Sequence, residues 1–456
     1  MTPSTDTIAA LATPAGSGSV AVIRVSGPAV PQIATTLLGG VPAPRMAQLN
    51  CFRAADGGVM DQGLVLYFPA PASFTGEHVL ELQGHGGMLA PDLVLKRLFA
   101  LGCRPARPGE FSERAFLNGK LDVAQAEAVA DLIGAGTSAA ARAAVRSMQG
   151  EFSARIHALQ AQLTELRTHV EAALDFPDEE LDVLRLDALR DRLTEVFAVF
   201  QSITAAARQG ALLREGVTVV IAGRPNAGKS SLFNRFVGDD VAIVTDQPGT
   251  TRDLNRHHLQ LSGLPVTLID TAGLRTASDA VEQEGIRRAR LEMQRADRIL
   301  FVMDASVATN ASAAAATLGS TDLDGLPPNV PVTLLMNKID LTGARPASTM
   351  EAGMSCIWVS AHTGEGLDLV REHLQQSVGL QPLESGALSA RRRHLDALRR
   401  ALELVRAAAV ALDASGASEL FAEDLRLAQR ALGEITGEFT SDDLLGEIFG
   451  SFCIGK

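Results

Sequence analysis

Cysteine is scarce in this chain, and its cysteines follow no structural pattern. The four of them, Cys51, Cys103, Cys356 and Cys453, lie far apart and form no C-x-x-C pair. Structural zinc sites and disulfide frameworks depend on regularly spaced cysteines, so the sequence predicts neither. Reduced thiols are typical of the cytosol, where disulfides are rare, and we therefore expect a cytoplasmic protein.

Long apolar runs and a targeting segment are also missing. No apolar stretch reaches the roughly 18 residues that a membrane-spanning helix requires, so the sequence predicts no stable insertion into a membrane. Residues 1–10 have no basic start, and Thr5, Asp6 and Thr7 interrupt their apolar residues, unlike a secretory signal. An association with a membrane surface stays open.

Positive charge is the minority sign. The chain has 41 basic and 53 acidic residues, which gives a net charge of −12. This balance argues against a general basic coat for nucleic acid but leaves room for a local basic patch. Apolar residues make up 46% of the 456 residues, enough for sizeable cores in about three domains.

One glycine-containing loop carries the most chemical information. Residues 223–230 read GRPNAGKS and fit G-x-x-x-x-G-K-[ST], the phosphate-binding loop of nucleotide hydrolases. An apolar run over 217–222 precedes the loop and a helix start at 231–236 follows it, as the motif requires. We expect backbone N–H groups to wrap a phosphate, Lys229 to reach the outer phosphates and the Ser230 hydroxyl to bind Mg²⁺.

A second motif indicates which base is bound. Residues 337–340 read Asn-Lys-Ile-Asp and fit N-K-x-D. The Asp340 carboxylate can accept two hydrogen bonds from guanine, whereas adenine would leave it unpaired at roughly 1–3 kcal/mol per buried group. The Lys338 stem can cover the base. Residues 360–362 read Ser-Ala-His where GTPases often carry Ser-Ala-Lys, and a backbone N–H there would meet the guanine carbonyl.

Two further motifs complete the set for a GTPase. Residues 270–273 fit D-x-x-G, which brings Asp270 near Mg²⁺ and the Gly273 N–H to the γ-phosphate. Residues 249–253 form a switch loop whose Thr251 hydroxyl would bind Mg²⁺. The four motifs occur in the right order and predict GTP binding. The predicted GTP contacts are Asn226, Ala227, Gly228, Lys229, Ser230, Ser231, Thr245, Asp246, Gln247, Pro248, Gly249, Thr250, Thr251, Asp270, Thr271, Ala272, Gly273, Asn337, Lys338, Asp340, Ser360, Ala361 and His362.

The group that activates the attacking water is less evident. Many GTPases place a glutamine directly after D-x-x-G, but this chain has Leu274 there, which cannot orient water. Glu282 could hold the water directly or through a second water, or could be a solvated carboxylate at a helix start. No arginine finger is evident. Asn226 could ligate a monovalent cation that replaces an arginine, or could be a turn residue.

The sequence pattern changes twice along the chain. Residues 1–118 are typical of an α/β domain, with predicted strands at 20–25, 64–68 and 79–82 and a helix at 91–101. Heptad-like apolar spacing then predicts long packed helices over 152–173, 186–203 and 395–412. The acidic connection at 175–180 could bind a metal but is more typical of a solvated turn.

Residues 216–378 alternate strands with helices and carry the nucleotide motifs. The predicted strands are 217–222, 266–269, 299–303, 332–336 and 357–359, and the stretch 305–330 is predicted to be a loop with at most one helix. Helical patterns flank this region on both sides. Insertion of the nucleotide domain into one discontinuous helical domain explains the order most simply, and two separate helical domains are the alternative.

The chain resembles the MnmE (TrmE) family of tRNA modification GTPases, within the TrmE-Era-EngA-YihA-Septin-like superfamily. The most specific match is the ending Phe452-Cys453-Ile454-Gly455-Lys456, like the family's C-I-G-K. Other matching stretches are 80–87, 108–116, 223–231, 270–275 and 434–439.

The resemblance implies a multidomain fold that combines α/β and all-α parts. Residues 1–118 would form an N-terminal α/β domain for tetrahydrofolate binding and dimerisation. Residues 119–215 and 379–456 would form the two parts of the helical domain, the second with the Cys-Ile-Gly-Lys motif. Residues 216–378 would form the inserted P-loop, Ras-like G domain.

The resemblance also assigns site residues. Asn226, Thr245, Gln247 and Thr250 match the potassium ligands, although Gln247-Pro248 departs from the family's commoner apolar-small pair, and Glu282 matches the water-positioning glutamate.

The folate site would use four charged residues, each of which alone could be an ordinary surface charge. Arg24, Lys120 and Lys456 would bind the carboxylates of the glutamate tail, and Glu81 would bind the donor edge of the pterin. Cys453 is a candidate thiol near the transferred one-carbon unit, or an inert tail cysteine.

The implied reaction is aminomethyl or carboxymethylaminomethyl addition at C5 of the wobble uridine of certain tRNAs. A homodimer would form a heterotetramer with two subunits of MnmG, which alone carries FAD. The one-carbon unit would come from 5,10-methylenetetrahydrofolate, with 5-formyltetrahydrofolate as a related ligand, and the nitrogen from glycine or ammonium. GTP, Mg²⁺ and K⁺ would bring the G domains together and activate hydrolysis, which would control the modification.

Two other functions compete with this interpretation. A ribosome-assembly GTPase switch would carry an RNA-binding module, and no basic Gly-x-x-Gly loop is present. A helical GTPase acting at a membrane surface would carry a basic amphipathic stretch, for which residues 391–394 are the only candidate.

Overall fold

The structure is a computed structural model. It describes residues 6–14, 16–175, 186–239, 256–261, 263–270, 287, 290–307, 326–351, 353–379, 386–415, 418–439 and 442–455. Contacts divide the chain into two units. Unit 1 comprises Met1–Ala130, Ser147–Phe197 and Asp396–Lys456, and unit 2 comprises Asp131–Arg146 and Ala198–Leu395.

Unit 1 begins with a six-stranded sheet in the order β3-β4-β5-β2-β1-β6. Neighbouring strands are antiparallel except β1 and β6, which are parallel. The strands are β1 (Ile8–Leu11), β2 (Val20–Ser26), β3 (Gln48–Arg53), β4 (Val59–Phe68), β5 (Val79–His85) and β6 (Arg104–Pro105).

Two helices, α1 (Val30–Leu38) and α2 (Leu89–Ala100), share one hydrophobic core with this sheet. In β2, Ala21, Ile23 and Val25 are buried and alternate with more exposed residues, the period of two expected for a half-buried strand. The predicted strands at 20–25, 64–68 and 79–82 and the helix at 91–101 are confirmed. The sequence patterns do not predict β1, α1, β3 and β6.

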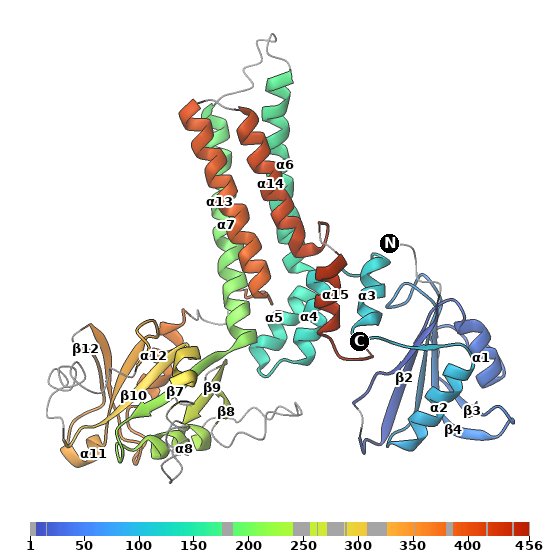
Figure 1. Ribbon diagram of the computed structural model, residues 1–456, viewed down its shortest axis with the longest axis horizontal. Helices are drawn as coiled ribbons and strands as arrows, with labels where there is room; N and C mark the ends of the chain where they lie inside the picture. The colour runs from blue at the N-terminus through green and yellow to red at the C-terminus, as the bar shows by residue number, and fades with distance from the viewer. Residues whose placement is uncertain are drawn as a thin grey trace. The chain divides into compact units, whose positions relative to one another are not determined.

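Helices, several of them long, make up the rest of unit 1. Helices α6 (Glu151–Asp175) and α14 (Ser418–Thr436) lie side by side (Figure 1), and the Gln429 side chain bridges them. Its Nε2 donates to Thr164 Oγ1 at 2.6 Å, and its Oε1 accepts from Arg167 Nη1 at 2.6 Å. Helices α7 (Leu186–Glu215) and α13 (Arg392–Ser415) contribute residues to both units, and α5 (Ser138–Met148) lies mainly in unit 2.

The heptad-like patterns are confirmed by α6 and α7 and in part by α13, where the predicted positions Leu395, Leu402 and Ala409 are only partly buried. The predicted apolar positions that are buried are Phe152, Ile156, Leu159, Leu163, Leu166, Val170, Leu189, Leu193, Val196, Phe200, Ile203, Leu398, Val405 and Leu412. One described helical stretch, Ala188–Glu215, is apolar and long enough to cross a bilayer, with a mean hydropathy of 1.2. A single such helix is weak evidence for a membrane span, because core helices have the same composition.

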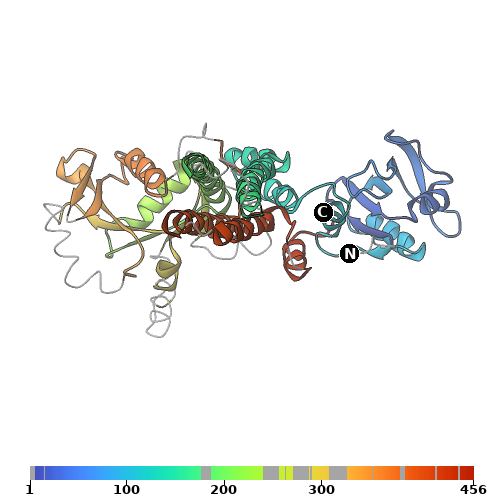
Figure 2. The same cartoon turned by 90° about the horizontal axis from the view of Figure 1, so that it is seen from above.

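A short helix near the C-terminus packs against two helices near the N-terminal sheet. Helix α15 (Asp442–Gly450) shares a core with α4 (Val123–Ile133), and α3 (Glu110–Leu117) contributes Phe116, whose ring centroid lies 6.1 Å from that of Phe449. Beyond α15 the chain runs to the N-terminal sheet, as Figure 1 and Figure 2 both show. There the Gly109 N–H donates to the Cys453 carbonyl at 3.3 Å.

Unit 2 contains a seven-stranded sheet in the order β12-β13-β11-β10-β7-β9-β8. The five central strands are parallel, and β8 and β12 are antiparallel edge strands. The strands are β7 (Val217–Gly223), β8 (Arg256–Leu261), β9 (Leu264–Asp270), β10 (Arg298–Asp304), β11 (Val332–Asn337), β12 (Ala347–Glu351) and β13 (Met354–Trp358).

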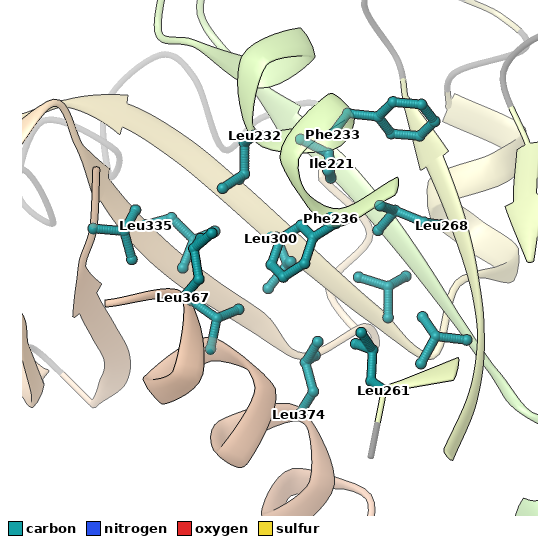
Figure 3. Packing of buried hydrophobic residues seen from close by; sticks show 14 of the residues in the cluster. Ile221, Leu232, Phe233, Phe236, Leu261, Leu268, Leu300, Leu335, Leu367 and Leu374 are labelled. Carbon is teal, nitrogen blue, oxygen red and sulfur yellow. The ribbon is translucent and has the colours of Figure 1, made fainter. Parts of the chain in front are cut away.

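Helices α8 (Lys229–Asp239) and α12 (Leu367–Ser377) share a core with one face of this sheet, and a short helix α11 (Ile339–Thr342) follows β11. Figure 3 shows Leu232 and Phe236 of α8 and Leu374 of α12 directed at strand residues such as Leu300. A second apolar cluster includes β10 and β11 residues such as Ile299 and Leu334. A parallel sheet with near-continuous apolar strands is the expected result of burial on both faces.

The predicted strands 217–222, 266–269, 299–303 and 332–336 are confirmed. The fifth, predicted at 357–359, runs from Met354 to Trp358 instead, because Ser355 pairs with Thr333 within the ladder. Residues 176–180 of the acidic connection at 175–180 lie outside the described residues. So do residues 308–325 of the predicted loop at 305–330.

Candidate active site

The phosphate loop connects β7 to α8, as its motif predicts. Gly228 has φ of 95°, and a Cβ there would lie 2.2 Å from Nδ2 of Asn337. Only glycine therefore allows the loop to approach β11 this closely. Asn226 also has a positive φ, 62°, a conformation that asparagine adopts more readily than most residues.

Lys229 and Ser230 open α8. The Lys229 side chain is nearly buried and its Nζ donates to the Arg224 carbonyl at 2.7 Å, across the loop. The Ser230 hydroxyl lies 3.2 Å from Asp270 Oδ2 at the end of β9. Strands β7 and β9 are parallel and pair Ile221 with Asp270, which brings the two motifs to the same edge of the sheet.

The Ser230 and Asp270 oxygens fit Mg²⁺, a hard cation that prefers oxygen ligands and keeps most of its waters and the substrate's phosphates. Among the described residues, no three His, Cys, Asp or Glu side chains converge on a metal position. A magnesium ion shared with phosphates needs only one or two protein ligands, so the hydroxyl and the carboxylate are sufficient.

Asn337 ties the phosphate loop to the base-binding motifs. Its side chain is buried, its Nδ2 donates to the Ala227 carbonyl at 2.9 Å, and its Oδ1 accepts from the Ala361 N–H at 2.9 Å. The Ala361 N–H is therefore already used by Asn337. If this N–H supplied the predicted contact to the guanine carbonyl, the base would compete with Asn337 for it. His362 is exposed.

Asp340 is oriented by a buried serine. Ser360 Oγ donates to Asp340 Oδ1 at 2.6 Å and accepts from the Thr363 N–H at 3.1 Å. The hydroxyl uses one carboxylate oxygen and leaves the other for guanine donors. The sequence motifs thus bring the phosphate loop, Asp270, Asn337 and Ser360 together at one sheet edge.

Several predicted site residues lie outside the described residues. They are Thr245, Asp246, Gln247, Pro248, Gly249, Thr250, Thr251, Thr271, Ala272, Gly273, Glu282 and Lys456. Of the four residues implied as potassium ligands, only Asn226 is described.

The residues implied for folate binding lie in unit 1. Arg24 on β2 faces Glu81 on β5, and its Nε and Nη2 donate to Glu81 Oε1 at 3.1 and 2.9 Å. The rings of Phe74 and Phe111 lie 5.7 Å from the guanidinium. The Arg24 Nη1 also lies 3.5 Å from the Gly455 carbonyl.

The C-terminal tail follows the same part of the sheet. Gly455 has φ of 95°, and a Cβ there would come within 2.5 Å of the Leu11 carbonyl. Cys453 is exposed. Lys120 lines a shallow, open pocket with Phe116 and Glu438, and its Cε would lie 3.4 Å from a Cβ at Gly76, in the loop that carries Phe74. Two of the three described folate candidates are thus adjacent, and the tail lies beside them.

Sequence reasoning missed two charged groups near these sites. One is Asp304, which pairs with Lys338. The other is Glu110, a buried carboxylate that accepts hydrogen bonds from Arg104, Arg114 and the Arg107 N–H. Burial tends to raise the pKa of Glu110, but these donors outweigh it and keep the pKa below its usual value. Neither carboxylate belongs to a nucleotide motif, so no spacing rule could indicate its partner.

Family models and full-length relatives match almost the whole chain. The family model described as "GTP-binding protein TrmE N-terminus" matches residues 7–120, and the "MnmE helical domain" model matches residues 123–453. The "tRNA modification GTPase MnmE" of Yersinia pseudotuberculosis serotype O:1b (strain IP 31758) is 55% identical over 453 residues, 99% of each chain. That of Methylococcus capsulatus is 54% identical over 454 residues, 100% of this chain and 99% of the relative.

Solved structures give a weaker comparison. The G domain of the Thermotoga maritima FeoB iron transporter is 24% identical and covers 35% of this chain and 97% of its own, with a TM-score of 0.24. An Aquifex aeolicus Era variant bound to GDP.AlF4- is 24% identical over 41% of this chain and 67% of its own, with a TM-score of 0.27. The full-length relatives and the family models show that this chain belongs to the MnmE family of tRNA modification GTPases, and it is a GTP hydrolase that acts in tRNA modification.

Proposed function

We propose that this GTPase is activated by K⁺ and acts with MnmG on the wobble uridine of certain tRNAs. The pair would add an aminomethyl or carboxymethylaminomethyl group at C5, using a one-carbon unit from 5,10-methylenetetrahydrofolate. The observation that carries this proposal is the contact of the Gly455 carbonyl with Arg24, whose guanidinium also donates to Glu81. It puts the thiol-bearing tail and two folate candidates in one neighbourhood.

The chemistry of this neighbourhood fits a reduced folate. The guanidinium of Arg24 suits the carboxylates of the glutamate tail, and the Glu81 carboxylate suits the donor edge of the pterin. The exposed ring of Phe74 beside Arg24 supplies apolar surface for the ligand, and the buried ring of Phe111 packs near the guanidinium. Lys120 and Lys456 would add positive charge for the same carboxylates. The bound folate would supply the one-carbon unit.

GTP hydrolysis is proposed to depend on charge neutralisation around the phosphates. Lys229 would neutralise the outer phosphates, and Ser230, Asp270 and Thr251 would hold Mg²⁺. Asn226, with Thr245, Gln247 and Thr250, would ligate K⁺ in the position that an arginine finger takes in other GTPases. Glu282 would orient the attacking water, since Leu274 offers no polar group.

The proposed assembly follows the domain division predicted from the sequence. Residues 1–118 would bind folate and join two chains into a homodimer, and residues 216–378 would form the inserted G domain. The helical segments 119–215 and 379–456 would connect the two and carry the Cys-Ile-Gly-Lys motif. Two MnmG subunits would complete a cytoplasmic heterotetramer that binds tRNA, and G-domain dimerisation would control the modification.

One experiment tests both halves of this proposal. Purified protein should bind 5-formyltetrahydrofolate in calorimetry. Its GTPase rate should rise at least about tenfold when K⁺ replaces Na⁺, which is the order of magnitude expected for the loss of one charge-stabilising group. Arg24→Ala should abolish folate binding and leave the potassium effect intact. Equal rates in both salts together with no folate binding would overturn the proposal.

A further inference from the structure

Asp304 lies at the carboxyl end of β10, beside the N-K-x-D motif. Strands β10 and β11 are parallel, and their register pairs Asp304 with Asn337. The Ala305 N–H donates to the Asn337 carbonyl at 2.8 Å, which joins the two strand ends. Lys338 follows with φ of 70° and ψ of 35°, and its Nζ lies 2.6 Å from Asp304 Oδ2.

The Asp304 carboxylate is itself held in place. Its second oxygen, Oδ1, accepts from the Ser306 N–H at 2.9 Å and from the Ser306 hydroxyl at 2.6 Å. Burial tends to raise the pKa of Asp304, but the hydrogen bonds from Lys338 and Ser306 outweigh it and lower the pKa below 3.8. The carboxylate is therefore ionised at neutral pH and offers Lys338 a fixed negative charge.

The ion pair between Asp304 and Lys338 contributes little to the stability of the fold, but it restricts the motion of the lysine stem. The side chains of Lys338 and Asp304 are 30% and 21% exposed, and partly exposed ion pairs stabilise a fold little. An unanchored lysine, however, samples many rotamers. Because the stem is the part of Lys338 that would cover the base, an anchored ammonium reduces the conformational freedom that nucleotide binding must remove.

We propose that Asp304 is a positioning residue for guanine-nucleotide binding, because its carboxylate holds the Lys338 ammonium and so sets the lysine stem in place before the base arrives. The residue lies outside the four GTPase motifs. It acts through Lys338 and independently of Asp340, whose carboxylate is oriented by Ser360. The inference rests on the GTP site and not on the proposed folate or potassium chemistry.

The test is Asp304→Asn in the full-length chain, measured with a fluorescent GDP analogue. The Kd should rise roughly 3- to 10-fold, the range for one side chain that must be ordered on binding, and mainly through faster dissociation. Asp368→Asn is the matched control, because that carboxylate pairs with Arg371 on the exposed side of α12, and its Kd should equal that of the wild type. An unchanged Kd in Asp304→Asn would overturn the proposal.

A double-mutant cycle separates positioning from a general structural effect. Lys338→Met keeps the stem and removes the ammonium, so in that background Asp304→Asn should change the Kd by less than about twofold. The same loss in both backgrounds would contradict action through Lys338. Thermal unfolding of each variant checks the fold, and Asp304→Ser replaces Asp304→Asn if the latter melts below the wild type.

A second nucleotide identifies which part of the base site is affected. The inosine analogue lacks the exocyclic amine that Asp340 would bind, but it presents the same ring face to the lysine stem. Asp304→Asn should therefore weaken GDP and IDP by the same factor. A loss confined to GDP would place the effect at Asp340 and overturn the proposal, whereas a wild type that binds neither nucleotide would contradict the GTP site itself.

Discussion

Glu110 is a buried carboxylate that neutralises several cations within unit 1. Its Oε1 accepts from Arg104 Nη2 at 2.6 Å and from Arg114 Nη2 at 3.1 Å, and its Oε2 accepts from the Arg107 N–H at 2.7 Å. Arg114 in turn contacts Glu77, two residues before β5 begins. These bonds fasten α3 to the N-terminal sheet, and α3 is the helix against which Phe449 packs.

Removing the Glu110 charge should destabilise unit 1 in a pH-dependent way. Glu110→Gln should lower the free energy of unfolding at pH 7 by about 1–3 kcal/mol, the range for a lost partner of buried charged donors. Since the pKa of Glu110 is lower in the folded state than its ordinary 4.5, its stabilisation is present above pH 4.5 and is lost as pH falls through the folded-state pKa. The difference in the free energy of unfolding between Glu110→Gln and the wild type should therefore become smaller as pH falls below 4.5.

Urea unfolding at pH 7 and at pH 3 measures this effect. Glu113→Gln is the control, because the ion pair that Glu113 forms within the described part of the chain is with Arg107, which is 62% exposed. It should change stability by less than about 0.5 kcal/mol. A loss in Glu110→Gln that stays constant across this range would show that packing, and not ionisation, is responsible.

At the scale of elements, the C-terminal tail depends on a conformation that only glycine adopts without strain. Gly455 passes within van der Waals distance of β1, and the Arg24 guanidinium lies against its carbonyl. The preceding helix α15 is held by its own apolar contacts, so the tail can be lifted without unfolding the helix. Tail position and fold stability should therefore be separable.

Gly455→Val should displace the tail and abolish tRNA modification while the GTPase rate stays within about twofold of the wild type. The Cβ would lie 2.5 Å from the Leu11 carbonyl, and a β-branched residue at positive φ adds strain. Removal of residues 453–456 should have the same effect. Modification is measured by nucleoside analysis of tRNA from a strain that carries the variant as its only copy.

Ile454→Ala serves as the control for tail displacement, because Ile454 is 59% exposed. It should keep modification near the wild-type level. Loss of GTP hydrolysis in Gly455→Val, in place of loss of modification, would mean that the tail supports the fold of the whole chain.

The sequence predicted elements wherever a pattern was strong and local. The seams of α6 and α7 followed from leucine spacing, and β7 and β10 from continuous apolar runs. The edge strands β8 and β12 were not predicted from the sequence, because solvated edge strands carry polar residues such as His257 and Thr349. At the site, the motifs named Lys229, Ser230 and Asp340, but the partners Asn337–Ala227 and Asp304–Lys338 depend on strand register, which no motif encodes.

At the scale of the whole molecule, unit 2 is built from two separate stretches of the chain, Asp131–Arg146 and Ala198–Leu395. Asp131 of the first stretch binds two parts of the second, the end of α7 and the return segment at residues 386–391. Its Oδ1 accepts from Arg214 Nε and from Arg391 Nη2, each at 2.9 Å, and its Oδ2 accepts from Ser389 Oγ at 2.7 Å. The Leu388 N–H donates to the Ala206 carbonyl at 3.2 Å, so the return segment lies directly on α7.

Asp131→Ala should weaken the attachment of residues 386–391 to α7. The variant removes a charged acceptor worth about 1.5–3 kcal/mol per hydrogen bond, and the amides of Leu388 and Ser389 should exchange with deuterium at least tenfold faster. Asp396→Ala, at an exposed pair with Arg399, should leave exchange unchanged. Equal protection in Asp131→Ala would mean that the backbone contacts alone hold the return segment.

The contact between Arg24 and Gly455 spans 431 positions of sequence. A ribosome therefore completes the N-terminal sheet, the entire nucleotide domain and most of the helices before the tail exists, and domains generally fold in that order. During synthesis the nascent chain acquires its GTPase machinery first and its tail contact last. A prematurely terminated product would carry the GTPase motifs without the tail that reaches Arg24, and a fusion partner attached behind the tail would crowd the surface around Arg24.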